Sequence, residues 1–252
     1  MRVVRNIGYI KRRRRTAKLM VLGGMLLLGG SWLLTLLYPT LFFVALAGLV
    51  FGFFFFNGGM QQIAKWSRNP RSDVVIDEEL RHLNDRYTLI HYPDLPGRRP
   101  EHILILPTGM IVLTTRAMIG RMSVKGRIWR KLGNPLGRFF TLSTPQLGNP
   151  TIESEEQVKA LHDFLEAENL PSRDTIEGIV VFVAENVEVD INEPTLPVLH
   201  VTELTEHIRS KTGDVTIGGK DREELIVGLS RGEAIESNAI TSARPKKRVR
   251  AA

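Results

Sequence analysis

The sequence predicts an α/β fold in which a hairpin of two transmembrane helices precedes a soluble domain with a mixed sheet. Residues 19–57 contain no Asp, Glu, Lys, Arg or His, which is typical of a membrane-spanning region. Two β-type runs, 102–106 and 110–115, flank a Pro-Thr-Gly turn and predict a β-hairpin. The continuous apolar run at 176–184 indicates a buried strand, and the apolar stripe of 155–168 indicates a helix.

The uncharged stretch divides into two helices, residues 19–38 and 41–57. A bilayer core of about 30 Å requires roughly 20 apolar residues in a helix. Pro39 lies between the two runs, and proline lacks an N–H and disfavours helix in the residue before it. Because an unbroken helix over the whole stretch would be too long for the bilayer, the pattern favours a hairpin.

Basic residues flank both ends of the hairpin and predict its orientation. Residues 1–18 carry eight Lys and Arg and no acid, and Lys65, Arg68 and Arg71 lie in 58–72. Cytoplasmic loops of membrane proteins collect Lys and Arg, so we expect both termini in the cytoplasm. Residues 1–18 are interpreted as a basic cytoplasmic N-terminus that anionic lipid headgroups attract, and 58–72 as a juxtamembrane linker.

Glycines on both helices permit close helix contact. Gly48 and Gly52 form a G-x-x-x-G pattern on the second helix. The first helix carries Gly23, Gly24, Gly29 and Gly30. Two interpretations stay open: these are ordinary membrane-helix glycines, or they form a face through which the chain assembles into a homo-oligomer.

The net charge of +7 belongs to the flanks of the chain and not to the domain. Between residues 73 and 243 there are 18 Lys and Arg against 27 Asp and Glu, so that region carries about −9. The high isoelectric point is therefore no evidence of a nucleic-acid-binding domain. The chain has no cysteine, which excludes disulfides and thiolate metal sites and fits a reducing compartment.

The soluble domain is predicted to cover residues 73–230, and the polar, basic tail 231–252 is predicted to be disordered. Thr151 or Ser154 is a suitable cap for the helix 155–168. The remaining expected elements are helices at 77–84, 203–210 and 221–230, strands at 87–91 and 198–201, and a second hairpin of 121–124 with 127–129.

Common catalytic motifs are absent from the sequence. There is no Walker-type phosphate loop, no G-x-S-x-G elbow and no pair of histidines at helical metal-binding spacing. The six histidines are scattered and are predicted to be surface or packing residues.

A series of motifs follows residue 101 in a fixed order. Glu101-His102 is followed by ILIL, Pro107-Thr108-Gly109, MIVL and Thr114-Thr115-Arg116, and then by Gly120 and Trp129. This order resembles the nuclease-related domain family called NERD, and downstream Asn149-Pro150 with Gln157 and Leu161 is similar to the family's Pro-then-Gln helix. The resemblance covers residues 73 to about 210 and implies a restriction-endonuclease-like fold.

The resemblance also implies a site at which an Asp and a Glu bind a divalent metal and a Lys positions the attacking water. Here Glu101 stands at the Asp position, Thr114 at the Glu position and Arg116 at the Lys position, with Asp73 as the upstream helix carboxylate. Mg²⁺ prefers carboxylate oxygens, and a hydroxyl is a poor substitute. A guanidinium cannot act as a base at neutral pH. The site is therefore predicted to be degenerate, with Glu101 and Asp73 as its only candidate Mg²⁺ ligands, although Glu101 and Arg116 can also be read as solvated surface residues.

A basic segment keeps nucleic acid among the expected ligands. No acid occurs between His102 and Ile152, and the stretch holds two aromatic residues, Trp129 and Phe139, among its cations. Such a segment can follow a phosphate backbone, lie on anionic lipid or be a plain solvated face. Its cations include Arg116 and Arg138, and those predicted to bind the ligand are Arg121, Lys125, Arg127, Arg130 and Lys131.

Three hypotheses follow from the sequence. The first is a membrane-anchored, catalytically impaired NERD-like module that binds nucleic acid or acts as a scaffold. The second is an active Mg²⁺-dependent nuclease that uses Asp73 and Glu101. The third is a structural membrane protein whose basic surface contacts anionic lipid. Thr114 favours the first over the second, because it removes a carboxylate that the metal requires.

Overall fold

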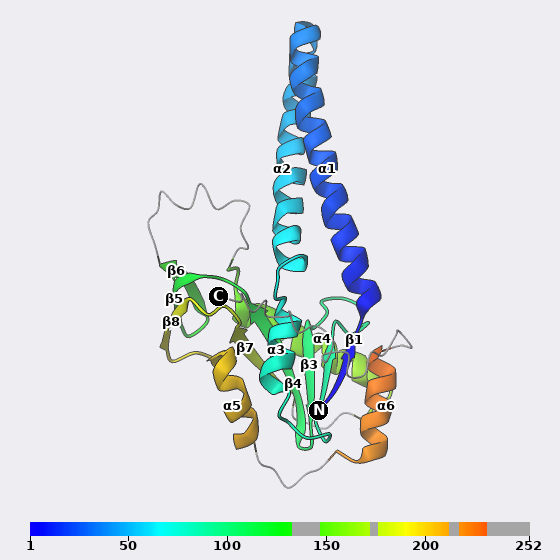
Figure 1. Ribbon diagram of the computed structural model, residues 1–252, viewed down its shortest axis with the longest axis vertical. Coiled ribbons are helices and arrows are strands. Elements are labelled where there is room, and N and C mark those ends of the chain that lie inside the picture. Colours follow the sequence, from blue (N-terminus) through cyan, green and yellow to red (C-terminus); the bar gives the residue numbers. More distant parts are fainter. Residues whose placement is uncertain (133–146, 172–175, 212–216, 231–252) are drawn as a thin grey trace, which may run out of the picture.

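The computed structural model describes residues 1–132, 147–171, 176–211 and 217–230 (Figure 1). It is a mixed α/β domain below a long helical hairpin, as the sequence predicted. The predicted disordered tail, 231–252, lies outside the described residues.

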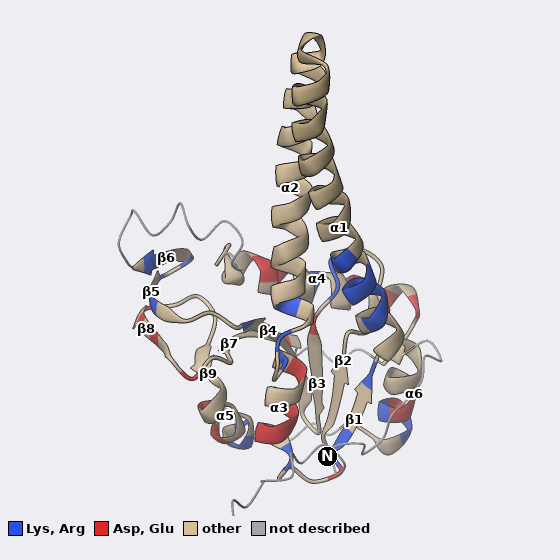
Figure 2. Ribbon diagram, turned by 45° about the horizontal axis from the view of Figure 1, so that its top comes forward, with Lys and Arg blue, Asp and Glu red and all other residues tan. Residues whose placement is uncertain are grey.

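The hairpin consists of α1 (Ile7–Leu37) and α2 (Phe42–Trp66), joined by a short 3₁₀ turn, η1 (Pro39–Leu41). Both helices are long and apolar enough to cross a membrane. Figure 2 shows that their outer parts carry no Lys, Arg, Asp or Glu. Their large apolar side chains face outward, and Phe43 is 81% exposed. Such a surface fits a membrane anchor, because hydrocarbon covers apolar area that water disfavours.

Both helices extend beyond the uncharged stretch. Asn6 caps α1, since its side chain accepts a hydrogen bond of 2.7 Å from the Tyr9 backbone N–H. At 1.5 Å per residue, the 31 residues of α1 span about 46 Å, well beyond a bilayer core of about 30 Å. The basic residues from Lys11 to Lys18 therefore form a helical base between the uncharged stretch and the domain.

The interpretation of residues 1–18 as a separate basic N-terminus is wrong. Residues 2–5 form β1 (Arg2–Arg5), which pairs in parallel with β2 (Thr88–His91). Val3 and Val4 are both buried, and the chain's amino group donates to the Leu83 carbonyl at 2.8 Å. Burial of this valine pair outweighs the solvation of its arginine neighbours, so the sheet begins before the hairpin.

The main sheet has six strands in the order β1-β2-β3-β4-β7-β9. The predicted hairpin is confirmed, because β3 (His102–Leu106) and β4 (Gly109–Arg116) are antiparallel neighbours. β7 (Ile176–Phe182) and β9 (Val198–His200) continue the sheet in parallel with β4.

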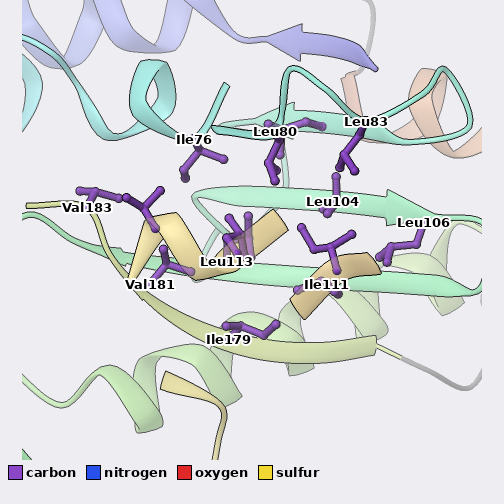
Figure 3. Packing of buried hydrophobic residues seen from close by; sticks show 14 residues of the cluster. Ile76, Leu80, Leu83, Leu104, Leu106, Ile111, Leu113, Ile179, Val181 and Val183 are labelled. Carbon is purple, nitrogen blue, oxygen red and sulfur yellow. The ribbon is translucent and has the colours of Figure 1, made fainter. Parts of the chain in front are cut away.

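Helices cover both faces of this sheet. On one face lie α3 (Ser72–Leu80) and α5 (Leu204–Ser210), and on the other α4 (Pro150–Ala167) and α6 (Gly219–Ser230). Figure 3 shows side chains of α3 packing against alternate residues of β3 and β4. The α3 residues labelled there are Ile76 and Leu80. Each fully buried Leu or Ile stabilises the fold by roughly 1.5–3 kcal/mol.

A second sheet has the order β6-β5-β8. β5 (Gly120–Lys125) and β6 (Ile128–Leu132) form the second predicted hairpin. β8 (Val187–Asn192) pairs in parallel with β5 and was not predicted.

Several predicted boundaries are corrected by the structure. The linker assigned to 58–72 is mostly helix, because α2 continues to Trp66. α3 begins at Ser72 and not at 77. Asn149, and neither Thr151 nor Ser154, caps α4: its side chain accepts from the Ile152 N–H at 3.2 Å.

The glycines of the hairpin differ in how closely they approach the neighbouring helix. A Cβ on Gly24 would lie 2.5 Å from the Phe56 backbone nitrogen, and one on Gly52 would lie 3.0 Å from Leu28. The G-x-x-x-G glycine Gly52 therefore lets α1 and α2 of one chain approach each other closely. A Cβ on Gly23 would meet nothing within 4 Å. Assembly of chains through glycines stays a prediction.

Candidate functional site

The end of β4 directs two of the predicted site residues toward α4. Successive side chains of a strand alternate between its faces, so Thr114 and Arg116 point to the same side. The Thr114 hydroxyl donates to Gln157 Oε1 at 3.1 Å, and Arg116 Nη2 donates to Glu153 Oε2 at 2.6 Å. Both partners belong to α4.

These four side chains form one hydrogen-bonded network. Gln157 Nε2 donates to Glu153 Oε1 at 3.3 Å, since the two residues lie one turn apart on α4. Arg116 also donates to the carbonyls of Leu147 and Thr115, at 3.1 and 2.9 Å. The Arg116 side chain is 11% exposed, so its reading as a solvated surface residue is wrong.

Glu101 lies immediately before β3 and is held from two sides. The Thr115 hydroxyl donates to Glu101 Oε2 at 2.8 Å, and Lys65, on the last turn of α2, forms an ion pair with Oε1. Burial opposes ionisation, but Lys65 and further cations outweigh it and lower the pKa of Glu101 to about 2. The side chain is 11% exposed, so Glu101 is not a solvated strand-end acid.

Asp73 is buried in α3 and is neutralised by two guanidinium groups. Arg71 Nε and Nη2 donate to its two oxygens at 2.9 and 2.8 Å, and Arg5 Nε lies 3.0 Å from Oδ2. Burial alone would raise the pKa of Asp73, but the hydrogen bonds from Arg71 and the nearby charges lower it to about 2. Arg5, from β1, also pairs with Asp77.

This arrangement does not fit a Mg²⁺ ion. Both sequence-predicted ligands, Glu101 and Asp73, already have cationic partners. Throughout the described ranges, no three His, Asp or Glu side chains gather as a metal site requires. Mg²⁺ wants several hard oxygen ligands, and a hydroxyl held by Gln157 does not replace the missing carboxylate.

Two cavities meet at the Lys65–Glu101 pair. One of about 320 Å³ lies between the base of the hairpin and α4, and reaches Gln157. The other, of about 210 Å³, reaches Arg116 and Leu147. Lys65, Glu101 and Glu153 line both cavities, so the candidate site opens beside the base of the apolar helices.

A buried chain of polar side chains behind Glu101 was missed by the sequence reading. Asp77 Oδ1 lies 2.7 Å from His91 Nε2, and His91 Nδ1 lies 2.6 Å from His102 Nδ1. Burial, with a contribution from His91, lowers the pKa of His102 to about 3. Both histidines are interior residues, in agreement with the packing interpretation. Their separation in sequence hid the contact, which requires β2 and β3 to pair His91 with His102.

The predicted basic segment is partly neutralised by acids from other elements. Arg121 Nε lies 3.0 Å from Glu188 on β8, and Arg127 pairs with Glu155 on α4. Trp129 turns inward, where its ring packs near Phe182 and its Nε1 donates to Thr151 at 2.8 Å. Trp129 is therefore not available to stack on a base, whereas Arg138 and Phe139 lie outside the described residues. Within the described part of the chain, the following cations of the segment have no ion-pair partner: Lys125 and Arg130.

Comparison with known families agrees with the motif order. The family model described as nuclease-related domain, NERD, matches residues 71–183. That range begins before α3 and ends after β7, so it contains the candidate site except for Lys65 and Arg5. No curated protein and no solved structure matches the chain. Residues 71–183 are thus similar to the nuclease-related domain family, and they follow two helices that are long and apolar enough to cross a membrane.

Proposed function

We propose that this protein is a membrane-anchored nuclease-related module that binds its ligand without cleaving it. The observation that carries the proposal is the ion pair between Lys65 and Glu101. This pair places a protein ammonium on the one carboxylate that the family-like motif retains beside β4. A metal ion would have to displace Lys65 to reach it.

The residues of β4 support the loss of cleavage. Thr114 supplies no negative charge, and its hydroxyl donates to Gln157. Arg116 is anchored by Glu153, and a guanidinium group cannot act as the base that takes a proton from water. The active-nuclease hypothesis therefore has neither a metal site nor a base in this arrangement.

We place the domain on the cytoplasmic side of the membrane. Both chain connections, at Asn6 and Ser67, lie at the same end of the hairpin, where Lys and Arg gather (Figure 2). Basic residues at this end favour the cytoplasm. The chain has no cysteine, so Thr40→Cys and Ser210→Cys each give a single thiol. In right-side-out vesicles an impermeant maleimide is expected to label only the Thr40 variant; labelling of the Ser210 variant alone contradicts this topology.

The ligand that we propose for the module is nucleic acid, held through its phosphates. Arg130 lies opposite Ser123 in the β5–β6 ladder, so it shares a sheet face with Arg121 and Lys125. With Trp129 turned inward, this face offers charge and no stacking platform. Binding is therefore expected to depend steeply on salt and weakly on sequence.

The test uses the full chain in lipid nanodiscs. Single- and double-stranded DNA should remain intact with Mg²⁺ or Mn²⁺, while a gel shift weakens as salt rises. Lys125→Gln with Arg130→Gln should reduce the slope of log K against log salt by roughly 1.4–1.8. Lys159→Gln with Arg209→Gln, which removes the same charge elsewhere, is the control. Cleavage abolished by Glu101→Gln would overturn the proposal, and no shift at low salt would remove nucleic acid as the ligand.

A further inference from the structure

A cavity at the outer base of α1 adjoins the first cavity of the candidate site, with which it shares Tyr9, Arg13 and Arg99, but Glu101, Thr114 and Arg116 do not line it. It measures about 550 Å³ and is lined by α1 and by the loop between β2 and β3. Its α1 residues, Tyr9, Arg12, Arg13 and Thr16, follow the spacing i, i+3, i+4, i+7 and so share one face of the helix.

Two guanidinium groups in this cavity are positioned by one aromatic ring. The Arg13 guanidinium carbon lies 5.1 Å from the Tyr9 ring centroid, and that of Arg99 lies 5.5 Å from it. Arg13 Nε also donates to the Tyr9 hydroxyl at 2.9 Å. Tyr9 is itself fixed, because its ring packs against Trp66 and Tyr92. The two cations are thus held close together before any ligand arrives.

The cavity carries an excess of positive charge. Arg12, Arg13 and Arg99 line it, and the single acid among its lining residues is Asp94, which pairs with Arg99 at 2.8 Å. Arg13 has no carboxylate partner among the described residues. Planar guanidinium groups bind phosphate oxygens through paired hydrogen bonds, and the Thr16 hydroxyl is a further donor. The chemistry of the lining therefore selects a phosphate group.

The depth of the cavity along α1 indicates where that phosphate comes from. Thr16 and Arg12 precede Leu19, the first residue of the uncharged stretch, by about 4 and 10 Å of helix rise. The headgroup layer extends roughly 5–8 Å beyond the hydrocarbon core. Above the cavity, the outward side chains of Leu19 and Leu26 are 58% and 68% exposed, as a surface for acyl chains requires.

We propose that this cavity binds the phosphate headgroup of an anionic phospholipid from the leaflet that faces the domain. The lipid's phosphate bridges Arg13 and Arg99, and its acyl chains lie along α1. Since Arg99 belongs to the domain and Arg13 to the hairpin, a bound headgroup ties the two together. This site is separate from the β5–β6 face, so it rests on the proposed membrane anchor and not on the proposed binding of nucleic acid.

The experiment measures lipid retention by the full chain in non-ionic detergent, using native mass spectrometry. Phosphatidylglycerol should be retained in preference to phosphatidylcholine, whose choline is repelled by the arginines. Arg13→Gln with Arg99→Gln should reduce phosphatidylglycerol retention about tenfold or more. Arg14→Gln with Arg15→Gln, which removes the same charge from neighbouring positions that do not line the cavity, should change it less than about twofold.

Three results would overturn the proposal. Equal loss in the two double variants would mean that diffuse charge, and not this cavity, retains the lipid. Equal retention of phosphatidylcholine would remove the selectivity for anionic headgroups. Displacement of the lipid by excess inorganic phosphate or by a short DNA duplex would assign the cavity to a soluble ligand. Arg13→Lys with Arg99→Lys, which preserves charge, should keep partial retention, and thermal unfolding of each variant shows that the fold is intact.

Discussion

The ammonium of Lys65 forms an ion pair with the carboxylate of Glu101 and so joins the last turn of α2 to the start of β3. One partner ends an apolar helix, and the other is the acid that the resemblance aligns with the family's metal-binding Asp. The hairpin therefore supplies a cation to the α/β domain. Lys65 also lines both cavities of the candidate site, which open beside the base of the apolar helices.

The first prediction concerns the strength of this pair. In a double-mutant cycle of Lys65→Gln and Glu101→Gln, we expect a coupling energy of about 1–2 kcal/mol. Glu101 is nearly buried, but Lys65 is 48% exposed, so solvent screening keeps the value below that of a fully buried pair. Thermal unfolding of the full chain in detergent measures it. A coupling below about 0.3 kcal/mol would place the pair with ordinary surface contacts.

The second prediction compares two arginines of β1. Arg5→Gln leaves the buried carboxylates of Asp73 and Asp77 short of a cation and should lower the free energy of unfolding by about 3 kcal/mol. Arg2→Gln removes an exposed pair with Glu223 and should cost less than about 1 kcal/mol. Urea unfolding provides both values. Similar costs for the two variants would show that β1 contributes no specific charge to the site.

Much of the fold could be predicted from local pattern. The uncharged stretch, the Pro-Thr-Gly turn and the apolar run of β7 each determine an element by themselves. β1 was missed because its two valines stand among arginines and gain their burial only from a distant strand. β8 was missed although Val187, Val189 and Ile191 alternate with polar residues, a signal that period-two analysis could have found.

The candidate site was predictable only in outline. The resemblance selected Glu101, Thr114, Arg116 and Gln157. The structure shows contacts for three of them on α4: Thr114 donates a hydrogen bond to Gln157, and Arg116 forms an ion pair with Glu153. The resemblance could not reveal Lys65 as the partner of Glu101, because that contact depends on how α2 enters the domain. Pairing between elements far apart in sequence is a tertiary property that residue spacing does not encode.

The third prediction tests the close contact between α1 and α2. Gly24→Ala places a methyl group against the Phe56 backbone and should force the helices apart, lowering the unfolding temperature. Gly23→Ala, one residue away, meets open space and should leave the temperature unchanged or raise it slightly. Thermal unfolding in detergent compares the two. If Gly23→Ala is the damaging change, that face is in contact with another molecule.

The fourth prediction concerns pH and the buried His102. Its pKa of about 3 in the folded chain lies below the ordinary value of 6.5, so between these values the unfolded chain binds more protons. Stability is therefore complete above pH 6.5 and is lost as pH falls toward 3. At pH 5 the loss should be about 2 kcal/mol. Asp73 and Glu101, with pKa values of about 2, add to the loss only below about pH 4.

Two variants separate His102 from the other histidines. His102→Gln should lower the free energy of unfolding at neutral pH, because it disturbs the contact with His91. Between pH 7.5 and 5, however, the variant should lose less of this free energy than the unsubstituted chain. His162→Gln, at an exposed position on α4, should keep the full pH dependence. Urea unfolding of each chain at the two pH values gives the comparison. An unchanged slope in His102→Gln would mean that His102 binds protons equally in the folded and unfolded chains, so that burial does not lower its pKa.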